Sequence, residues 1–387
     1  MKTRAIIGLI LLFTIISTSN STLALPTTQF SSTSKLASGK WVKIQVSETG
    51  IHEISAKQLT EMGFTDINKV KIFGKGGYVI DEALNEDIND NFPQVPTTIY
   101  NGKLIFYAKG ATQMTINRST AAPYYTGKVN PYSQYGHYFV TDSDDFQALS
   151  VNVATTVETE ETFNQDICYD YIYHNNEIFS FLCSGKTFYG ENILENYKLT
   201  FTMPNYVENS PIALSFSLGC DVSTTTTASA SINGTNIPLT SNSIPRLGSN
   251  RKFEICSPVG TSTDVASADS YSLKINIASS NVNSAYLDYY TVTYLKYTSF
   301  PSDSTQMRLG FFNPSTEHKV ELKNIDETVY VWNVTHDQPK DQITLNKGEN
   351  IYIFFAEGCF LINYICFVKL SCRFTLKHYL IGSYAYS

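Results

Sequence analysis

Apolar and polar residues alternate along several segments in the middle of the chain. Every second side chain is apolar over residues 212–220, and residues 199–203 and 273–277 show the same period of two. Residues 285–297 form a longer, aromatic strand pattern. A period of two places one face of a strand in a core and the other in solvent. We therefore predict an antiparallel, jelly-roll-like β-sandwich domain over residues 160–298.

The preceding block combines short strand patterns with one short helix. Residues 41–46 and 51–54 have the alternation of two strands joined by a polar turn, which predicts a β-hairpin. Ser55 and Gln58 have the spacing of a helix capping box, and Gly63 stands where a glycine commonly ends a helix. The block therefore predicts a mainly β domain that contains one helix of about two turns.

Glycine-containing turns separate the strand patterns. Asn101-Gly102 and Asn233-Gly234 are typical of two-residue hairpin turns. Gly74-Lys75-Gly76-Gly77 resembles a phosphate-binding loop only superficially, because Tyr78 follows it instead of a Ser or Thr that opens a helix. We predict a tight turn there.

The C-terminal part divides into a third β segment and an atypical tail. Residues 299–357 contain three further strand patterns, over 320–322, 329–334 and 351–355. Residues 358–387 hold three of the seven cysteines and no Asp or Glu. We interpret this tail as the product of a truncated or shifted reading frame. A buried terminal strand and a short membrane-associating tail over residues 359–370 are the alternatives.

The first 24 residues have the pattern of a secretory signal peptide. Lys2 and Arg4 precede an apolar run over residues 6–16, and Ala24 ends a small-residue cleavage pattern. Cleavage there leaves a linker over residues 25–37 and changes the net charge from −7 to −9, because two positive charges are removed. The expected location is the periplasm, the outer membrane or the cell surface.

Composition supports a β-rich protein of two or three domains. Tyr and Phe number 26 and 23 beside 2 Trp, and aromatic residues favour strands. The negative net charge, without a Lys/Arg cluster, argues against nucleic acid as a partner.

Candidate chemistry is sparse. The sequence has no Gly-x-Ser-x-Gly elbow, no His-Glu-x-x-His motif and no Walker lysine. The acidic stretch over residues 81–90 lacks the order of a calcium loop, so we predict a solvated loop. Cys220 continues the apolar alternation before it, which predicts a small core residue.

The remaining cysteines and the histidines give no stronger signal. They lie in strand or loop contexts without zinc-ligand spacing. They are Cys168, Cys183, Cys256, Cys359, Cys366, Cys372, His52, His137, His174, His318, His336 and His378. We therefore assign no catalytic, cofactor-binding or metal-binding residue, and expect no cofactor.

A set of ordered segments resembles the N-terminal region of the PorU family, the gingipain-like sortases of the type IX secretion system. The segments are residues 38–46, 50–55, 70–77, 104–110, 135–139, 184–191, 285–289 and 331–335. In that family they belong to β-rich, non-catalytic domains that precede a caspase-like cysteine peptidase domain. The resemblance implies a gingipain-propeptide-like β domain over residues 38–145.

The resemblance also implies a function and partners. Full-length relatives cleave the C-terminal signal of exported cargo and attach the cargo to anionic lipopolysaccharide. They dock on an outer-membrane barrel protein, PorV. Their catalytic His-Gly and Ala-Cys pairs are absent from this sequence, so the resemblance implies a Bacteroidetes-type envelope protein without peptidase activity of its own.

Two other functions stay open. A carbohydrate- or cell-surface-binding module is suggested by Tyr286, Tyr290 and Tyr294, if these rings are exposed rather than buried between sheets. The second alternative is a propeptide-like inhibitor or chaperone that acts on a separate peptidase domain.

Overall fold

The computed structural model describes most of the chain between residues 30 and 381. The described ranges are 30–80, 91–117, 122–153, 163–182, 186–195, 197–278, 281–300, 305–312, 318–320, 322–323, 329–335, 341–345, 361–367 and 378–381. The predicted signal peptide, the acidic loop over residues 81–90 and the predicted strand over 351–355 lie outside them. The chain divides into two compact units, residues 1–38 with 80–92 and residues 39–79 with 93–387.

The described part of the smaller unit contains a short 3-10 turn, Lys35–Ala37. The Ser34 hydroxyl caps the turn by accepting a hydrogen bond from the backbone N–H of Leu36 at 3.1 Å. The ammonium group of Lys35 donates to the Phe92 carbonyl at 2.8 Å. The Lys35 contact joins the two sequence segments of this unit.

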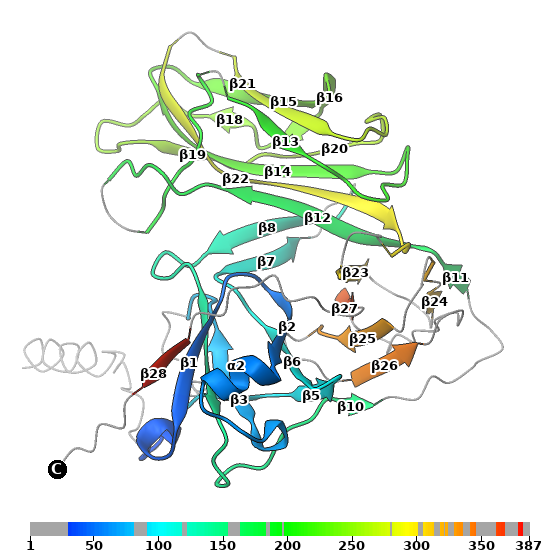
Figure 1. Ribbon diagram of the computed structural model, residues 1–387. Coiled ribbons are helices and arrows are strands. Elements are labelled where there is room, and N and C mark those ends of the chain that lie inside the picture. Colours follow the sequence, from blue (N-terminus) through cyan, green and yellow to red (C-terminus); the bar gives the residue numbers. More distant parts are fainter. Residues whose placement is uncertain are drawn as a thin grey trace, which may run out of the picture. The chain divides into compact units, whose positions relative to one another are not determined.

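The N-terminal part of the larger unit is built from two antiparallel sheets and one helix, α2 (Ala56–Glu61) (Figure 1). A 3-10 turn, Ile67–Lys69, leads into the third strand. The first sheet has the order β28 (His378–Ile381), β1 (Trp41–Val46), β9 (Gly136–Thr141), β3 (Lys71–Gly76) and β4 (Gln94–Val95). The second has the order β2 (Gly50–Ser55), β6 (Lys103–Ala108) and β5 (Thr97–Tyr100).

The predicted hairpin between residues 41–46 and 51–54 is wrong. Both segments are strands, but β1 pairs with β9 and β28, whereas β2 pairs with β6. The apolar residues of both strands explain this outcome, because Val42, Ile44 and Ile54 meet in one core between the two sheets. Burying both apolar faces requires the chain to change sheets at residues 47–49.

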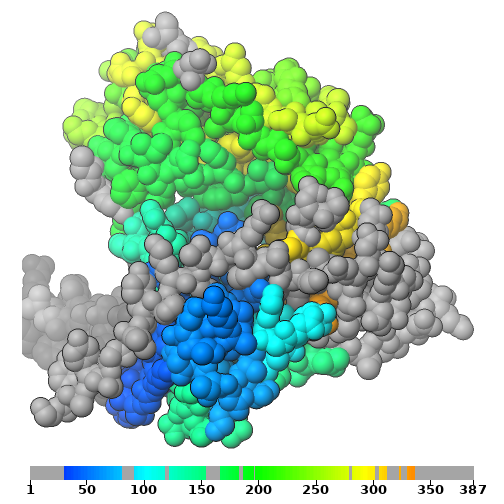
Figure 2. Space-filling view, viewed as in Figure 1, coloured from blue at the N-terminus to red at the C-terminus, as the bar shows by residue number. Residues whose placement is uncertain are grey.

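The predicted helix is confirmed with both of its end signals. The hydroxyl of Ser55 accepts from the Gln58 N–H at 3.3 Å, and the Gln58 side chain accepts from the Ser55 N–H at 2.9 Å. Gly63 adopts φ +80° beyond the last turn, where the Phe64 N–H bonds to the Leu59 carbonyl at 2.8 Å. Leu59 is buried, and the opposite side of the helix forms part of the blue surface in Figure 2.

Residues 74–77 do not form the predicted tight turn. Residues 74–76 end strand β3 with a bulge against β9, and Gly77 follows the strand. A Cβ atom on Gly74, which has φ +155°, would lie 2.7 Å from the Tyr138 ring and 2.9 Å from the His137 carbonyl oxygen. Gly74 is therefore required because two backbones approach each other closely here. In the sequence, a glycine with this role looks the same as a glycine of a turn.

Two mainly antiparallel sheets form the sandwich, and their strands from β12 to β22 are green to yellow in Figure 1. Among the described residues the larger sheet has the order β10 (Asn152–Val153), β26 (Asp341–Leu345), β25 (Val329–Asn333), β27 (Leu361–Phe367), β23 (Gln306–Phe312), β12 (Ile167–Asn175), β22 (Val282–Tyr297), β14 (Ile212–Val222), β20 (Val259–Ser262) and β17 (Leu239–Thr240), with β19 (Glu254–Cys256) also paired to β14. The second sheet consists of β13 (Leu199–Phe201), β21 (Tyr271–Ile277), β15 (Thr226–Ile232) and β16 (Thr235–Ile237), with β18 (Ser243–Ile244) on β15.

Two smaller pairs complete the described strands. They are the antiparallel hairpin β7 (Thr112–Asn117) with β8 (Tyr124–Val129) and the parallel pair β11 (Phe163–Gln165) with β24 (His318–Val320). Over the described ranges the fold class is therefore mainly β, with one short α-helix and an antiparallel sandwich, as the sequence predicts. The domain boundaries placed from the sequence stay predictions.

Two segments of the C-terminal tail are strands. β27 lies between β25 and β23 in the larger sheet, and β28 pairs with β1 from residue 378 to residue 381. This pairing agrees with the alternative that the tail contributes a terminal strand. That the tail arises from a truncated or shifted reading frame stays a prediction. No helix among the described residues is long and apolar enough to cross a membrane.

Candidate functional site

The cysteines that the structure describes with their side chains are buried free thiols. They are Cys168, Cys220 and Cys256. Burial raises the pKa of Cys220 to about 12 and that of Cys256 to about 11, so both thiols stay protonated and unreactive near neutral pH. The prediction that Cys220 is a small core residue is confirmed. Cys183, Cys359 and Cys372, and the side chain of Cys366, lie outside the described residues.

His52 and His174 make contacts that are typical of structural residues. A ring nitrogen of His52 lies 3.0 Å from the Glu48 carbonyl oxygen, and burial lowers the pKa of His52. His174 lies 2.9 Å from a carboxylate oxygen of Glu191 and stacks on the Tyr290 ring. His52 thus contacts a backbone carbonyl and His174 a carboxylate, and neither of these two contacts is that of a general base with a thiol or hydroxyl. His336 and the side chains of His318 and His378 lie outside the described part.

The expectation of three exposed tyrosines on the long strand is wrong for two of them. Tyr290 and Tyr294 are 2% and 1% exposed and belong to the sandwich core. The cause is a bulge in β22, where Leu218 pairs with Leu287 and Ser217 pairs with Tyr289. The extra residue reverses the facing of all later side chains. Tyr286 thus lies on the outer side, half-buried and stacked on Phe179 at 4.3 Å.

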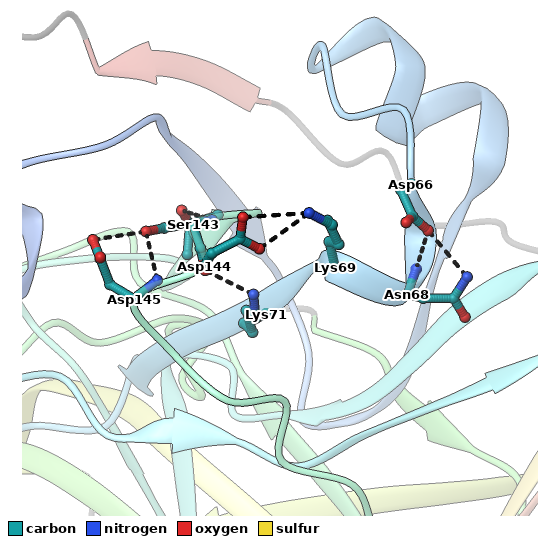
Figure 3. A network of polar contacts seen from close by, with 8 residues as sticks. Asp66, Asn68, Lys69, Lys71, Ser143, Asp144 and Asp145 are labelled. Carbon is teal, nitrogen blue, oxygen red and sulfur yellow. Dashed lines mark hydrogen bonds and ion pairs between the residues drawn. The ribbon is translucent and has the colours of Figure 1, made fainter.

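A polar network near the start of β3 is a structural contact (Figure 3). The Lys71 ammonium donates to the Ser143 carbonyl at 2.7 Å, and Lys69 pairs with Asp144 at 3.2 Å. These bonds hold the loop after β9 against β3. No group of three or more His, Cys, Asp or Glu side chains within the described ranges has the arrangement of a metal site.

A cavity of about 510 Å³ is the strongest candidate site. Six tyrosines contribute to its lining. They are Tyr78, Tyr107, Tyr125, Tyr169, Tyr171 and Tyr173. The turn Ser47–Thr49 between β1 and β2, the hairpin β7–β8 and strands β12 and β23 supply the walls. Tyr169, Tyr171 and Tyr173 share one face of β12 because side chains alternate along a strand.

Asp170 and Arg308 line this cavity, and the buried Lys296 pairs with Asp170. A carboxylate oxygen of Asp170 lies 2.6 Å from the Lys296 ammonium, and the other lies 3.0 Å from Nη2 of Arg308. The Arg308 guanidinium also lies 3.8 Å from the centre of the Tyr171 ring. Lys296 is buried at 4% exposure, whereas the Arg308 side chain is 45% exposed.

The electrostatics of this group follow from burial and pairing. Burial alone would raise the pKa of Asp170, but the charges of Arg308 and Lys296 outweigh it and hold that pKa below its ordinary value. Burial likewise raises the pKa of Tyr125, which packs on Tyr171 at 4.4 Å between ring centres. The cavity therefore presents phenols and a permanently charged guanidinium together with the carboxyl groups of Asp170 and Glu48. Such a site suits binding rather than covalent catalysis.

Sequence reasoning missed this cluster. Asp170 and Arg308 are far apart along the chain, and only the pairing of β12 with β22 and β23 brings them together. A signal was present, because Asp170 and Lys296 are charged residues inside two long aromatic strands. Charged residues at such positions are rarely buried unless they are paired.

Comparison with known proteins bears on the fold of this chain. No protein-family model matches the chain, and no curated protein matches it. Among solved structures, the crystal structure of dimeric latent PorU from Porphyromonas gingivalis matches with a TM-score of 0.64 and 23% sequence identity. The match covers 85% of this chain and 30% of that chain. The chain has a PorU-like fold.

This PorU-like fold is the part of the family resemblance that the comparison bears out. The chain spans less than a third of the PorU chain that it matches. The activity and partners of PorU therefore enter below only as proposals.

Proposed function

We propose that this chain is a non-catalytic N-terminal region of a PorU-like sortase of the type IX secretion system. The observation that carries the proposal is the fold similarity to PorU over 85% of the chain. The ordered segments that resemble the PorU family between residues 38 and 335 support the same assignment.

The chemistry of the described residues supports a binding or supporting role. The three described thiols are buried and protonated, and ring nitrogens of His52 and His174 lie against a backbone carbonyl and a carboxylate. An exported location, an outer-membrane partner that resembles PorV and contact with exported cargo are parts of this proposal.

Deletion of the gene from its source bacterium tests the role in secretion. We expect exported proteins to keep their C-terminal signals, detected by mass spectrometry of their C-terminal peptides, and reintroduction of the gene to restore processing. Normal processing in the deletion strain would contradict the proposal.

The purified chain should not cleave peptides. We expect no thiol-dependent turnover of basic or other peptide substrates, because a cysteine peptidase needs an activated thiolate. An active gingipain-like enzyme serves as the positive control. Cleavage that copurifies with the chain and is abolished by a thiol-alkylating reagent would refute the prediction.

The same assay distinguishes the inhibitor alternative. A propeptide-like inhibitor would lower the rate of the gingipain-like control when the chain is added, whereas the supporting role leaves that rate unchanged. The glycan-binding alternative loses its original basis, because Tyr290 and Tyr294 are buried.

A further inference from the structure

An apolar patch lies on the outer face of the larger sheet of the sandwich. Three aliphatic side chains, Ile178, Leu182 and Ile255, are 74%, 56% and 59% exposed. Ile255 of β19 pairs with Gly219 of β14, and Gly219 pairs with Tyr286 of β22. Directly paired residues share one face of a sheet, and the neighbours of Gly219 along β14 lie in the core. The row from Ile255 to Tyr286 therefore faces outward.

Stacked aromatic rings form the base of this apolar patch. Phe179 stacks on Tyr286 at 4.3 Å between ring centres, and Phe181 stacks on Phe253 at 4.6 Å. The rings of Phe179 and Phe181 lie 5.1 Å apart. These contacts join the loop after β12 to the segment that leads into β19. The three exposed side chains adjoin this base, which is preorganised for a partner because its rings already hold one another.

The rim of the apolar patch carries charges of both signs. Lys252 and Glu177 are exposed, and Arg251 pairs with Glu254 at 2.6 Å. An apolar centre within a polar rim is the anatomy of a protein–protein interface. An anionic membrane surface attracts clusters of Lys and Arg instead. The charges therefore favour a protein over a lipid surface as the partner.

The length of the matched PorU chain bears on which protein covers the patch. The match covers 85% of this chain but 30% of that chain, so most of PorU lies outside the match. Domains of one chain meet at surfaces that resemble interfaces between separate proteins. Contiguous exposed apolar patches are typical of such interaction sites. The remaining part of a PorU-like protein is therefore the partner that these observations favour.

We propose that the apolar patch is the surface through which this chain docks on the remaining part of a PorU-like sortase. The inference rests on the proposed function and adds the place of contact. Ile178, Leu182 and Ile255 are the central contacts, because their exposed apolar area is the area that docking removes from water.

Photo-crosslinking in the source bacterium tests the contact. A benzophenone amino acid in place of Leu182 of the full chain captures the molecule that covers this position, and mass spectrometry identifies it. We expect a PorU-like peptidase chain, recognised by the His-Gly and Ala-Cys pairs that this sequence lacks. A crosslink to lipid or to an unrelated protein, or no crosslink, would overturn the proposal.

Charge substitutions measure the contribution of the apolar patch. Ile178→Asp combined with Ile255→Asp should lower the crosslink yield by about tenfold or more, because two apolar contacts at the centre of the interface are lost. Both side chains are mostly exposed, so the variant should fold, and thermal melting verifies this. Val153→Asp is the matched control, because Val153 is also 74% exposed but lies on β10. Its yield should stay within about twofold of the parent value, and an equal yield from the double variant would contradict the docking surface.

The processing assay separates this inference from the proposed function. In the deletion strain, the double variant should fail to restore cleavage of C-terminal signals, whereas Val153→Asp should restore it. Full restoration by the double variant would overturn the docking surface and leave the proposed function intact. Normal processing in the deletion strain would contradict the proposed function, and the crosslinked species would then decide the contact by itself.

Discussion

Asp288 occupies the bulge position of β22, where it interrupts the pairing with β14. Burial raises its pKa to about 6, while a hydrogen bond with the Ser217 side chain acts in the opposite direction and Glu177 adds to the rise. The unfolded chain has the ordinary carboxyl pKa of 3.8. The folded protein therefore holds this proton up to a higher pH than the unfolded chain does.

This difference predicts a pH dependence of stability. The contribution of Asp288 is fully present below pH 3.8 and is lost as the pH rises through about 6, because the carboxylate must then be buried. Asp288→Asn should remove this loss and raise the free energy of unfolding at pH 8 by about 1–3 kcal/mol. Urea unfolding between pH 4 and pH 8 measures the effect.

The control for this prediction is Asp269→Asn, which changes the same charge at an exposed position. Its pH profile should follow that of the parent chain. If the unfolding free energies of Asp288→Asn and the parent chain change with pH in parallel, the Asp288 carboxyl group does not have a raised pKa in the folded protein.

Single residues differ in how well the sequence predicts their place. The burial of Cys220 follows from strict alternation within one strand. The burial of Tyr290 does not, because a bulge two residues earlier reverses the facing and has no marker in the sequence. The contact of Arg308 with Asp170 depends on strand order, which local patterns do not encode.

At the scale of elements, strand β14 carries an aromatic cover on its outer face. Phe181 and Tyr189 lie directly over Gly219, and a Cβ atom there would lie 2.7 Å from both rings. Phe181 also stacks on Phe253 at 4.6 Å. Because Gly219 has no side chain, the aromatic rings of Phe181 and Tyr189 can pack directly on strand β14.

Gly219→Ala should loosen this cover. The added methyl group displaces two rings, and such overpacking costs about 1–3 kcal/mol of unfolding free energy. Gly248→Ala is the matched control, because no atom lies within 4 Å of the added Cβ. Thermal unfolding compares the two variants, and equal melting temperatures would contradict the role of Gly219.

Elements are predicted well where the signal is local. The Ser55 and Gln58 capping box and the Asn101-Gly102 turn form as expected, the turn with φ +48° and +70°. The hairpin expected between residues 41–46 and 51–54 fails because alternation gives strands but not partners. Which sheet a strand joins is decided by the core that its apolar face can share.

At the scale of the whole molecule, the hairpin β7–β8 is bound to the sandwich. The Tyr125 backbone N–H donates to the Thr293 hydroxyl at 3.0 Å, and the Thr291 hydroxyl donates to the Tyr125 carbonyl. Thr291 and Thr293 are 0% and 1% exposed. Since these bonds are buried, we expect the N-terminal β domain and the sandwich to unfold together.

Thr293→Val tests this coupling. The variant keeps the side-chain shape but leaves the buried Tyr125 N–H without its acceptor, which should cost about 1–3 kcal/mol. Trp41 lies in β1 and Trp332 packs against Ile51 of β2, so tryptophan fluorescence reports on the N-terminal part and can be compared with circular dichroism of the whole chain. We expect one coincident transition, shifted to lower denaturant.

The control is Thr200→Val on the exposed face of β13, which should leave the transition in place. Two separate transitions in the parent chain would show that the hairpin contacts do not couple the domains.

The turn over residues 47–49 can be exchanged without disturbing the strands on either side of it. Three consecutive residues line the cavity, while the strands on either side are fixed in two different sheets. A turn held at both ends in this way can be exchanged or lengthened without a change in strand register. Ligand selectivity could therefore diverge between relatives, or be redesigned, by grafting this one turn while the surrounding scaffold is kept.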